Sequence, residues 1–157
     1  MSVPQDKIYN VYWEGPFEWK QSDTAQRAQH VLYAIYGTHP VYGTGSLLYI
    51  GRSERSGSKR LSEHNPWVKN ESGQVYFYLG SVGEFENWAL WDVEKNRKSV
   101  DPSVVASIET LLIHAHQPAY NLKSLRKPSE FRRIRLFNSG KYETLLPECS
   151  FRYYWDE

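Results

Sequence analysis

The sequence contains one cysteine and one methionine among 157 residues. A single cysteine excludes an intramolecular disulfide framework and a cysteine-rich zinc site. Long apolar runs are also missing, because no stretch approaches the roughly 18 consecutive apolar residues of a membrane-spanning helix. Residues 1–4 do not resemble the start of a signal peptide. We therefore expect a cytoplasmic protein with no membrane partner.

The composition is that of a globular chain with an excess of aromatic residues. Hydrophobic residues make up 40% and charged residues 24% of the chain, which predicts one domain over residues 1–157 rather than a disordered or coiled-coil chain. Aromatic residues reach 15%, with 6 Trp and 12 Tyr. Such an excess indicates either a dense core or flat surfaces that stack bases or sugars, and composition does not decide between them.

Positive charge is unevenly placed, although the formal net charge is only +1. Cations gather in residues 52–60 and again in residues 123–135. Phosphate binding depends on local cation density rather than on the whole-chain sum. The alternative is two solvated faces on an ordinary surface. The first interpretation gives these nucleic-acid-binding candidates: Arg52, Lys59, Lys123, Arg126, Lys127, Arg132, Arg133 and Arg135.

Alternating and β-branched segments predict several strands. Residues 7–19 are expected to form one or two strands interrupted at Gly15-Pro16, and further strands are expected over 31–37, 47–51 and 75–82. The glycine- and proline-containing stretch 38–46 predicts a wide loop between the second and third of these segments. The tail predicts a hairpin, with strands over 132–137 and 141–146 and a turn at 138–140.

Helices are expected between these strands. Short helices are predicted over 22–29 and over 59–64, the second stopping near Pro66. The clearest helix starts after Asp101-Pro102, follows the 3.6-residue apolar period and ends before Pro118. Residues 84–100 fit a helix or a strand equally. Together these elements predict an α/β domain of the α+β type with a central sheet.

Some polar side chains stand out on these elements. Glu109 lies on or beside the apolar face of the long helix, which indicates a partner or a metal, unless it sits at the edge of that face and points to water. Arg60 and His64 are four residues apart and share a helix face. Tyr33 and Tyr36 must face opposite sides of their strand, so one of them is available to a site.

Five segments together resemble the GIY-YIG nuclease family: Val31–Tyr36, Leu48–Gly51, Lys59–His64, Ile108-Glu109 and Pro118–Asn121. The resemblance covers roughly residues 31–122, which would form the catalytic core, with 1–30 and 123–157 as extensions packed on it. It implies a small antiparallel sheet of about three strands flanked by helices, beside the extra N-terminal strands and the C-terminal hairpin. It also implies a divalent cation, Mg²⁺ or Mn²⁺, and hydrolysis of phosphodiester bonds.

The resemblance also implies a set of catalytic residues: Tyr33, Tyr49, Arg60, His64, Glu109 and Asn121. Glu109 would be the metal ligand. This sequence has Val31 where the family has a glycine, and its 38–46 loop is longer than usual. A shifted register would make Tyr36 the first functional tyrosine, but Tyr33 fits better because Ile35 follows it at the usual apolar position.

The predicted function is a metal-dependent endonuclease with DNA as the expected substrate. One carboxylate suggests one cation held by Glu109, water and phosphate. Arg60 would hold a phosphate oxygen, and Tyr33 would deprotonate the attacking water, either with its pKa lowered by Arg60 and the metal or by passing its proton to His64. The alternative is a catalytically silent nucleic-acid-binding module. Double-strand cleavage by one active site would need a homodimer or two sequential nicks.

Overall fold

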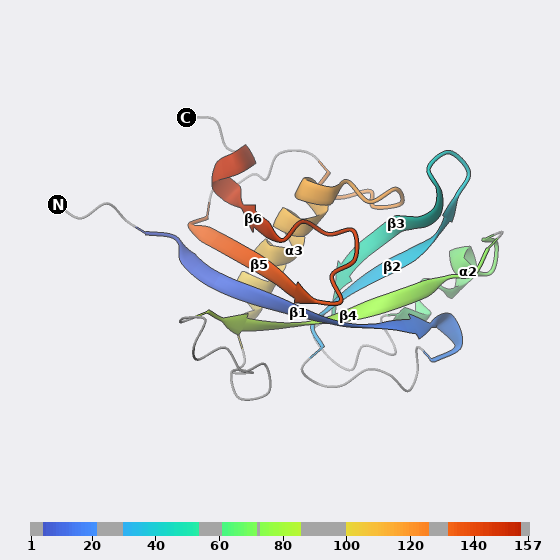
Figure 1. Ribbon diagram of the computed structural model, residues 1–157, viewed down its shortest axis with the longest axis horizontal. Helices are drawn as coiled ribbons and strands as arrows, with labels where there is room; N and C mark the ends of the chain where they lie inside the picture. Colours follow the sequence, from blue (N-terminus) through green and yellow to red (C-terminus); the bar gives the residue numbers. More distant parts are fainter. Residues whose placement is uncertain are drawn as a thin grey trace.

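The computed structural model describes residues 5–21, 30–53, 61–71, 73–85, 100–125 and 132–154 (Figure 1). Six strands form one sheet: β1 (Lys7–Glu18), β2 (Leu32–His39), β3 (Gly43–Arg52), β4 (Tyr76–Glu84), β5 (Ile134–Gly140) and β6 (Glu148–Ser150). The helices that lie wholly within the described residues are α2 (Asn65–Val68) and α3 (Pro102–His116), and short 3-10 turns form η1 (Trp19–Gln21) and η3 (Phe151–Tyr154).

The sheet is mixed, with the strand order β3-β2-β4-β1-β5-β6. Strands β1 and β5 pair in parallel, and the other neighbouring pairs are antiparallel. The predicted α+β fold, with about three strands flanked by helices, is therefore wrong. The N-terminal segment is one long strand at the centre of the sheet, and the C-terminal segment supplies two more. Both extensions are built into the sheet instead of being packed on a smaller one.

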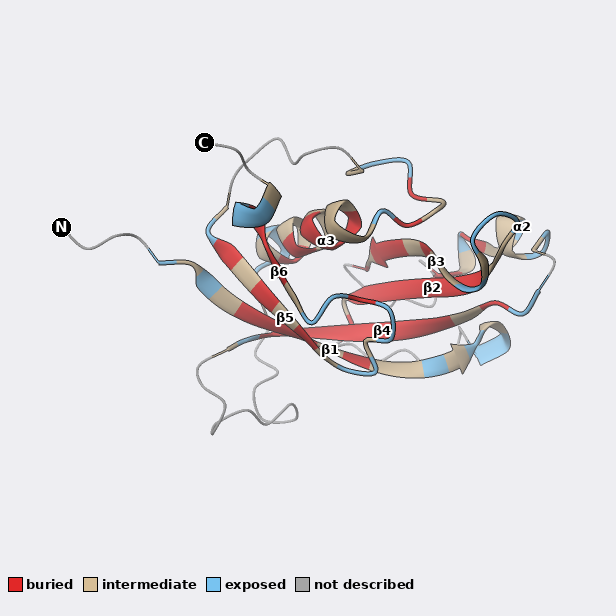
Figure 2. Cartoon of the chain, turned by 45° about the horizontal axis from the view of Figure 1, so that its top comes forward, coloured by how far each residue is buried: buried red, intermediate tan, exposed pale blue. Residues whose placement is uncertain are grey.

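The sheet curls around α3, as Figure 1 shows. Six flat strands would place the outer two about 24 Å apart, whereas a helix with its side chains is about 10–12 Å across. Yet α3 contacts both outer strands, β3 and β6. Its buried residues Ile108, Leu111 and Leu112 join one core with residues of β1, β2 and β5. In Figure 2 the buried side of α3 lies against the sheet.

Strand β2 is buried on both faces and separates two cores. Ala34 and Tyr36 belong to the core that contains α3. Tyr33 and Ile35 belong to a second, smaller core with Leu61. The expected opposite orientation of Tyr33 and Tyr36 is thus confirmed. The core to which each tyrosine belongs follows from the two-residue period of the strand, which points Tyr33 and Tyr36 to opposite faces.

The predicted wide loop over 38–46 is wrong. Strand β2 continues to His39 and β3 begins at Gly43, so only residues 40–42 form the turn. Gly43 and Gly45 have φ values of 89° and 70°, which are accessible to glycine at low cost. One of the two register shifts in this strand pair lies at these glycines, between Gly37 and His39 of β2, so the glycines mark irregular pairing and not a loop.

Helix α3 confirms the clearest sequence prediction. The Asp101 side chain accepts a hydrogen bond from the Ser103 backbone N–H, and Pro102 occupies the first turn. Gln117 ends the helix in the left-handed conformation, with φ of 48°. By contrast, Pro66 lies in the first turn of α2, so it begins a helix instead of stopping one. The predicted helix over 22–29, residues 59–60 and most of the ambiguous stretch 84–100 lie outside the described residues.

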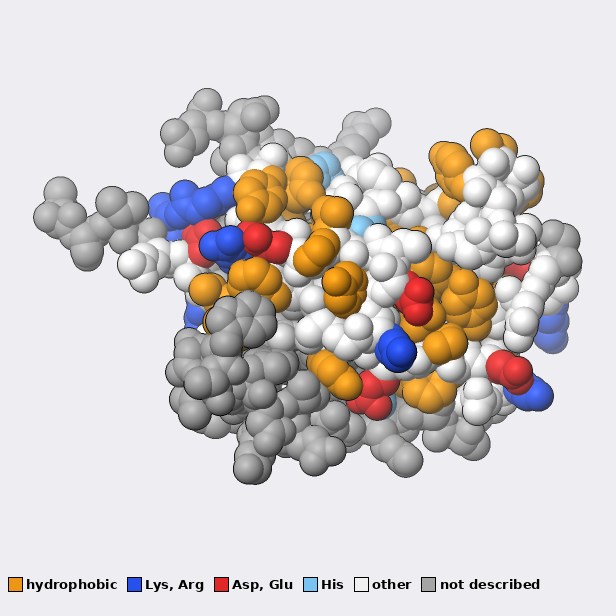
Figure 3. All heavy atoms as spheres, in the orientation of Figure 1, with side chains coloured by type: hydrophobic (Ala, Val, Ile, Leu, Met, Phe, Trp, Pro, Cys, Tyr) orange, Lys and Arg blue, Asp and Glu red, His pale blue; other side chains and the backbone are white. Residues whose placement is uncertain are grey.

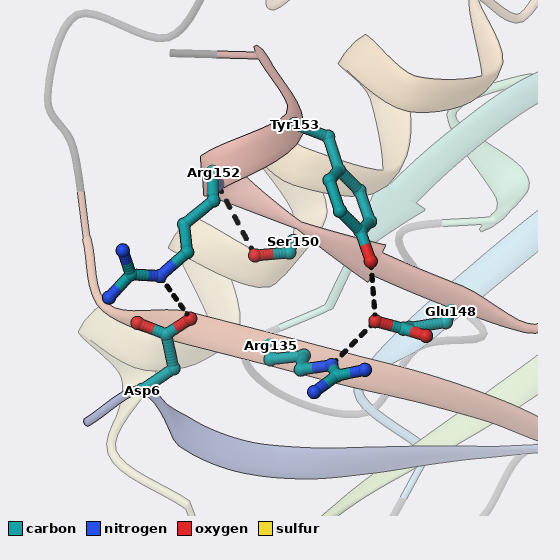
Figure 4. A network of polar contacts seen from close by, with 6 residues as sticks. All are labelled: Asp6, Arg135, Glu148, Ser150, Arg152 and Tyr153. Atoms are coloured by element: carbon teal, nitrogen blue, oxygen red, sulfur yellow. Dashed lines mark hydrogen bonds and ion pairs between the residues drawn. The ribbon is translucent and has the colours of Figure 1, made fainter. Parts of the chain in front are cut away.

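The C-terminal hairpin forms with a different second strand. Strand β5 continues to Gly140, and its partner β6 starts only at Glu148, so the predicted strand over 141–146 is wrong. Figure 4 shows the polar contacts at this end of the sheet. Glu148 accepts hydrogen bonds from Arg135 and Tyr153, and Arg152 pairs with Asp6 at the start of β1. These contacts tie the two chain ends together.

None of the helices within the described ranges has the length and apolar character needed to cross a membrane.

The environment of His116, at the end of α3, predicts that the free energy of unfolding depends on pH. Its Nδ1 lies 2.7 Å from the Leu112 carbonyl, and its Nε2 accepts the Leu146 backbone N–H at 2.8 Å. Burial lowers the pKa of His116, against a smaller raising effect of the Leu112 carbonyl. The neutral ring is favoured in the fold, so its contribution to stability is complete above about pH 6.5 and declines as the pH falls below that value.

We expect His116→Gln to remove part of the acid sensitivity, because glutamine can accept the Leu146 N–H but does not take up a proton. The measurement is the urea unfolding midpoint of both proteins at about pH 7.5 and about pH 5.5. An equal loss of stability in both proteins on acidification would contradict the assignment.

Candidate active-site cleft

A cleft of about 1100 Å³ lies along the outer strand β3. Its walls come from β3, from the segment at and after α2, from α3 and from the chain that follows α3. The side chains that line the cleft include Tyr49, Arg52, Trp67, Asn70, Glu71, Glu109, Tyr120, Asn121 and Lys123. Three predicted catalytic residues, Tyr49, Glu109 and Asn121, therefore border one cavity.

Asn121 holds the chain after α3 against β3. Its side-chain oxygen accepts the Ile50 backbone N–H, and its side-chain nitrogen donates to the Ile50 carbonyl, both at 3.0 Å. The backbone N–H groups of Ala119 and Tyr120 donate to Leu47 and Leu48 of the same strand. The outer edge of β3 is thereby covered, as exposed sheet edges commonly are. Asn121 acts as a positioning residue in this arrangement.

Tyr33 lies on β2 and its side chain extends over β3, the strand that lines the cleft. It pairs across the ladder with Gly51, and a side-chain carbon at Gly51 would overlap the Tyr33 hydroxyl. Glycine is required here because the phenol occupies the space of a side chain. The ring of Tyr33 stacks on Tyr49, with centroids 6.1 Å apart and planes at 17°. The Tyr33 side chain is buried, whereas Tyr49 lines the cleft.

A short hydrogen-bond chain connects Trp67, His64 and Tyr33. The Trp67 indole N–H donates to His64 Nδ1 at 3.0 Å, and His64 Nε2 lies 2.9 Å from the Tyr33 oxygen. An indole nitrogen only donates, so His64 Nδ1 must accept and a neutral ring carries its proton on Nε2. His64 therefore donates to the Tyr33 oxygen. One version of the predicted mechanism required His64 to accept the Tyr33 proton. A neutral His64 that already carries its proton on Nε2 cannot do so.

Glu109 projects from α3 toward the cleft. Its Oε1 lies 3.7 Å from Arg52 Nε, and its side chain is 20% exposed. Glu109 lies beside Arg52, and the Tyr33 oxygen lies beside Gly51, the preceding residue of β3. This contact is longer than a hydrogen-bonded ion pair, and the cavity leaves space beside the carboxylate.

The donor set fits Mg²⁺ or Mn²⁺ better than zinc. Among the residues that the structure describes, no group of three or more His, Cys, Asp and Glu side chains gathers as metal ligands would. Structural and catalytic zinc sites need three or four protein ligands. Mg²⁺ keeps several waters and takes only one or two carboxylates plus substrate phosphates. A half-buried carboxylate beside a large open cavity meets that requirement.

Tyr120 and Glu71 form a second polar pair in the cleft. The Tyr120 hydroxyl donates to Glu71 at 3.5 Å. Burial raises the pKa of Tyr120, and the nearby Glu71 charge adds to the effect. Tyr120 therefore remains a neutral phenol near pH 7 and serves as a hydrogen-bond donor or a ring surface.

Tyr36, the alternative first tyrosine, lies on the other face of β2. Its hydroxyl is 3.1 Å from the Thr144 hydroxyl, and its ring stacks on Tyr76. Burial raises the pKa of Tyr36 to about 12, with opposing hydrogen bonds from Thr144. Its phenol stays protonated at neutral pH and is separated from His64 by the sheet.

The predicted basic residues that the structure describes lie in separate places. Arg52 and Lys123 border the cleft. Arg132 instead donates to Ser103 and Ser107 in the first half of α3, and Arg135 pairs with Glu148. Arg133 is exposed just before β5. The remaining candidates, and the predicted catalytic arginine, lie outside the described residues: Lys59, Arg60, Arg126 and Lys127.

Trp67 was not identified from the sequence as a hydrogen-bond partner of His64. The two residues are three positions apart, and this spacing places side chains on neighbouring positions of a helical turn. The signal was therefore present, but it does not reveal which ring nitrogen the indole contacts.

Comparison with family models, with curated proteins and with solved structures gave no match for this chain.

Asn121→Ala should destabilise the protein, because both polar groups of the Ile50 backbone would lose their partner. We expect a loss of roughly 2 kcal/mol or more in the free energy of unfolding, measured by urea denaturation. Asn70→Ala is the matched control, since Asn70 is exposed and makes one side-chain contact to the Pro66 carbonyl. Equal stability of the two variants would show that the Ile50 contacts do not hold the cleft together.

Proposed function

We propose that the chain is a metal-dependent endonuclease that hydrolyses phosphodiester bonds of nucleic acid, with DNA as the expected substrate. One observation carries the proposal: Glu109, Tyr49 and Asn121, far apart in sequence, border one cleft, and Tyr33 with His64 lies directly behind Tyr49. These are five of the six residues that the GIY-YIG resemblance selects. The sixth, Arg60, stays a prediction.

Glu109 would hold the divalent cation. When bound there, the cation supplies charge stabilisation for the phosphoryl group and for the leaving oxygen. Glu109 is suited to this because its carboxylate is half buried and faces the cavity. Arg52 and Lys123 are the described cations that border the same space, and they are placed to bind phosphate oxygens of the substrate.

Activation of the attacking water is assigned to Tyr33. An N–H donated by His64 stabilises the phenolate form of Tyr33, and the phenolate is the form that a general base needs. Trp67 supports this by fixing the His64 tautomer. The role requires the buried Tyr33 oxygen to become accessible to water when substrate enters. Tyr49, which lines the cleft, contacts the phosphate or the water.

Tyr33 is preferred to Tyr36 for this role on geometric grounds. Tyr33 lies at Gly51 of β3 and receives the His64 N–H. Tyr36 faces the other core, where its hydroxyl meets Thr144 instead of His64.

Glu109→Gln should abolish divalent-metal-dependent cleavage and leave the fold intact, because glutamine keeps the shape of the side chain and removes the anionic ligand. The measurement is nicking of supercoiled plasmid with Mg²⁺ or Mn²⁺ and with EDTA, together with circular dichroism. Glu84→Gln is the control, since Glu84 is an exposed residue of β4 that pairs with Lys7.

Cleavage by Glu109→Gln at the wild-type rate would refute the metal assignment. Metal-independent DNA binding without cleavage by the wild-type protein would favour the catalytically silent module.

Trp67→Phe should lower kcat by on the order of 10- to 100-fold, the cost usual for partners that orient a metal-bound histidine, because the Trp67 indole orients the His64 ring in the same way. The other His64 tautomer would then let Tyr33 keep its proton. We expect KM to change little and the acid limb of the pH–rate profile to move to higher pH. Trp19→Phe is the matched control, because the Trp19 indole also packs in the smaller core but donates to Asn65. An unchanged pH profile in Trp67→Phe would exclude the tautomer role.

A further inference from the structure

Aromatic rings continue from the candidate catalytic residues along the cleft. The His64 ring contacts Tyr49 at 4.5 Å and Trp67 at 5.8 Å between centroids. Trp67 meets Tyr120 edge to face at 5.4 Å. Both Trp67 and Tyr120 line the cavity and are only partly buried. The rings are thus exposed to a ligand in the cleft.

The row extends beyond the cleft to the tip of the β2–β3 hairpin. Tyr120 contacts His39 at 5.8 Å, and His39 stacks on Tyr42 at 4.5 Å with planes at 21°. The side chain of Tyr42 ends the row at the turn, where Tyr42 is 72% and Val41 is 80% exposed. Figure 3 shows hydrophobic side chains gathered at this tip, at the upper right.

The tip is held in place by His39. Its Nδ1 accepts the backbone N–H groups of Val41 and Tyr42, each at 3.1 Å. Large exposed rings on a turn have no role in the two cores, and a turn that is fixed by hydrogen bonds presents them in a defined orientation. Such pre-organisation reduces the entropy lost on binding.

We infer that this aromatic row, defined as Trp67, Tyr120, His39 and Tyr42, is a binding track for unpaired bases of a single nucleic-acid strand. The inference rests on the proposed function and specifies its substrate: a strand that is single, or is unpaired beside the cleaved bond. Bases stack on aromatic side chains only when they are exposed, and a duplex buries its base faces.

Two observations favour a nucleic-acid strand as the occupant. The row is continuous with the cleft that contains Glu109 and Tyr49, so a strand on the row leads its backbone to the candidate catalytic groups. The cleft also carries Arg52 and Lys123, which can contact single phosphate groups although Glu71 and Glu109 balance their charge, and Asn70 adds an amide. Stacking surfaces combined with cations along a groove are the usual basis of sequence-tolerant single-strand binding.

The test measures binding in EDTA, where the proposed cleavage does not occur. Fluorescence anisotropy is recorded with a short single-stranded DNA of mixed sequence and with the blunt duplex of the same sequence. We expect the wild-type protein to bind the strand about tenfold or more tightly than the duplex. Tyr42→Ala should weaken strand binding by about 5- to 100-fold, the range expected for one stacked base.

Three comparisons make the result specific. Tyr42→Phe should retain strand binding, because it keeps the ring face. Duplex binding should be unchanged in Tyr42→Ala. Tyr153→Ala should bind like wild type, since Tyr153 is also an exposed tyrosine (62%) but lies on η3, at the other end of the molecule from the hairpin tip (Figure 1).

Equal affinity for strand and duplex, or full strand affinity in Tyr42→Ala, would overturn the inference. The outcome is independent of catalysis. Cleavage of duplex DNA without single-strand preference would reject the binding track and leave the nuclease proposal in place. Strand binding that depends on Tyr42, in a protein that cleaves nothing with Mg²⁺ or Mn²⁺, would retain the track and reject the nuclease.

Discussion

The two hydrogen bonds between the Asn121 side chain and the Ile50 backbone hold the candidate site together. Ile50 lies between Tyr49, which faces the cleft, and Gly51, which accommodates the Tyr33 hydroxyl. The same contact fixes the chain after α3, and with it Tyr120 and Lys123, on the outer strand. The chain after α3 therefore covers the outer edge of β3 and also forms one wall of the cleft. Removing the Asn121 amide would release the chain after α3 from β3 while leaving the side chains of Tyr33, Tyr49 and Glu109 unchanged.

The elements that were predicted well depend on local sequence. The Asp101 cap, Pro102 and the apolar period specify α3 through neighbouring residues, and the strands β2 and β4 follow from β-branched and aromatic runs. The sheet as a whole was not predictable in this way. Pairing of β1 with both β4 and β5 joins segments far apart in the chain, and no local pattern specifies which distant strand a segment will join.

The candidate site shows the same division. The resemblance of its segments to GIY-YIG nucleases implied phosphodiester chemistry, but the distances between these residues depend on tertiary structure. The position of Trp67 three residues after His64 was visible, whereas the direction of the proton on His64 follows only from the indole contact. Pro40 and the glycines at 43 and 45 suggested a wide loop. The positive φ values of the glycines instead allow a tight hairpin, whose tip is hydrogen-bonded to His39 and presents Tyr42.

The charges of the described residues that line the cleft nearly cancel, which bears on the proposed binding of a nucleic-acid strand. Among the described residues that border it, Arg52 and Lys123 are balanced by Glu71 and Glu109. Phosphate attraction from such a set is weak and decreases with salt, so it would not by itself retain a strand. Stacking is not screened by salt and contributes for every exposed base. In the proposed complex, stacking on Trp67, Tyr120 and Tyr42 would therefore supply the attraction that the nearly balanced charges of the cleft do not.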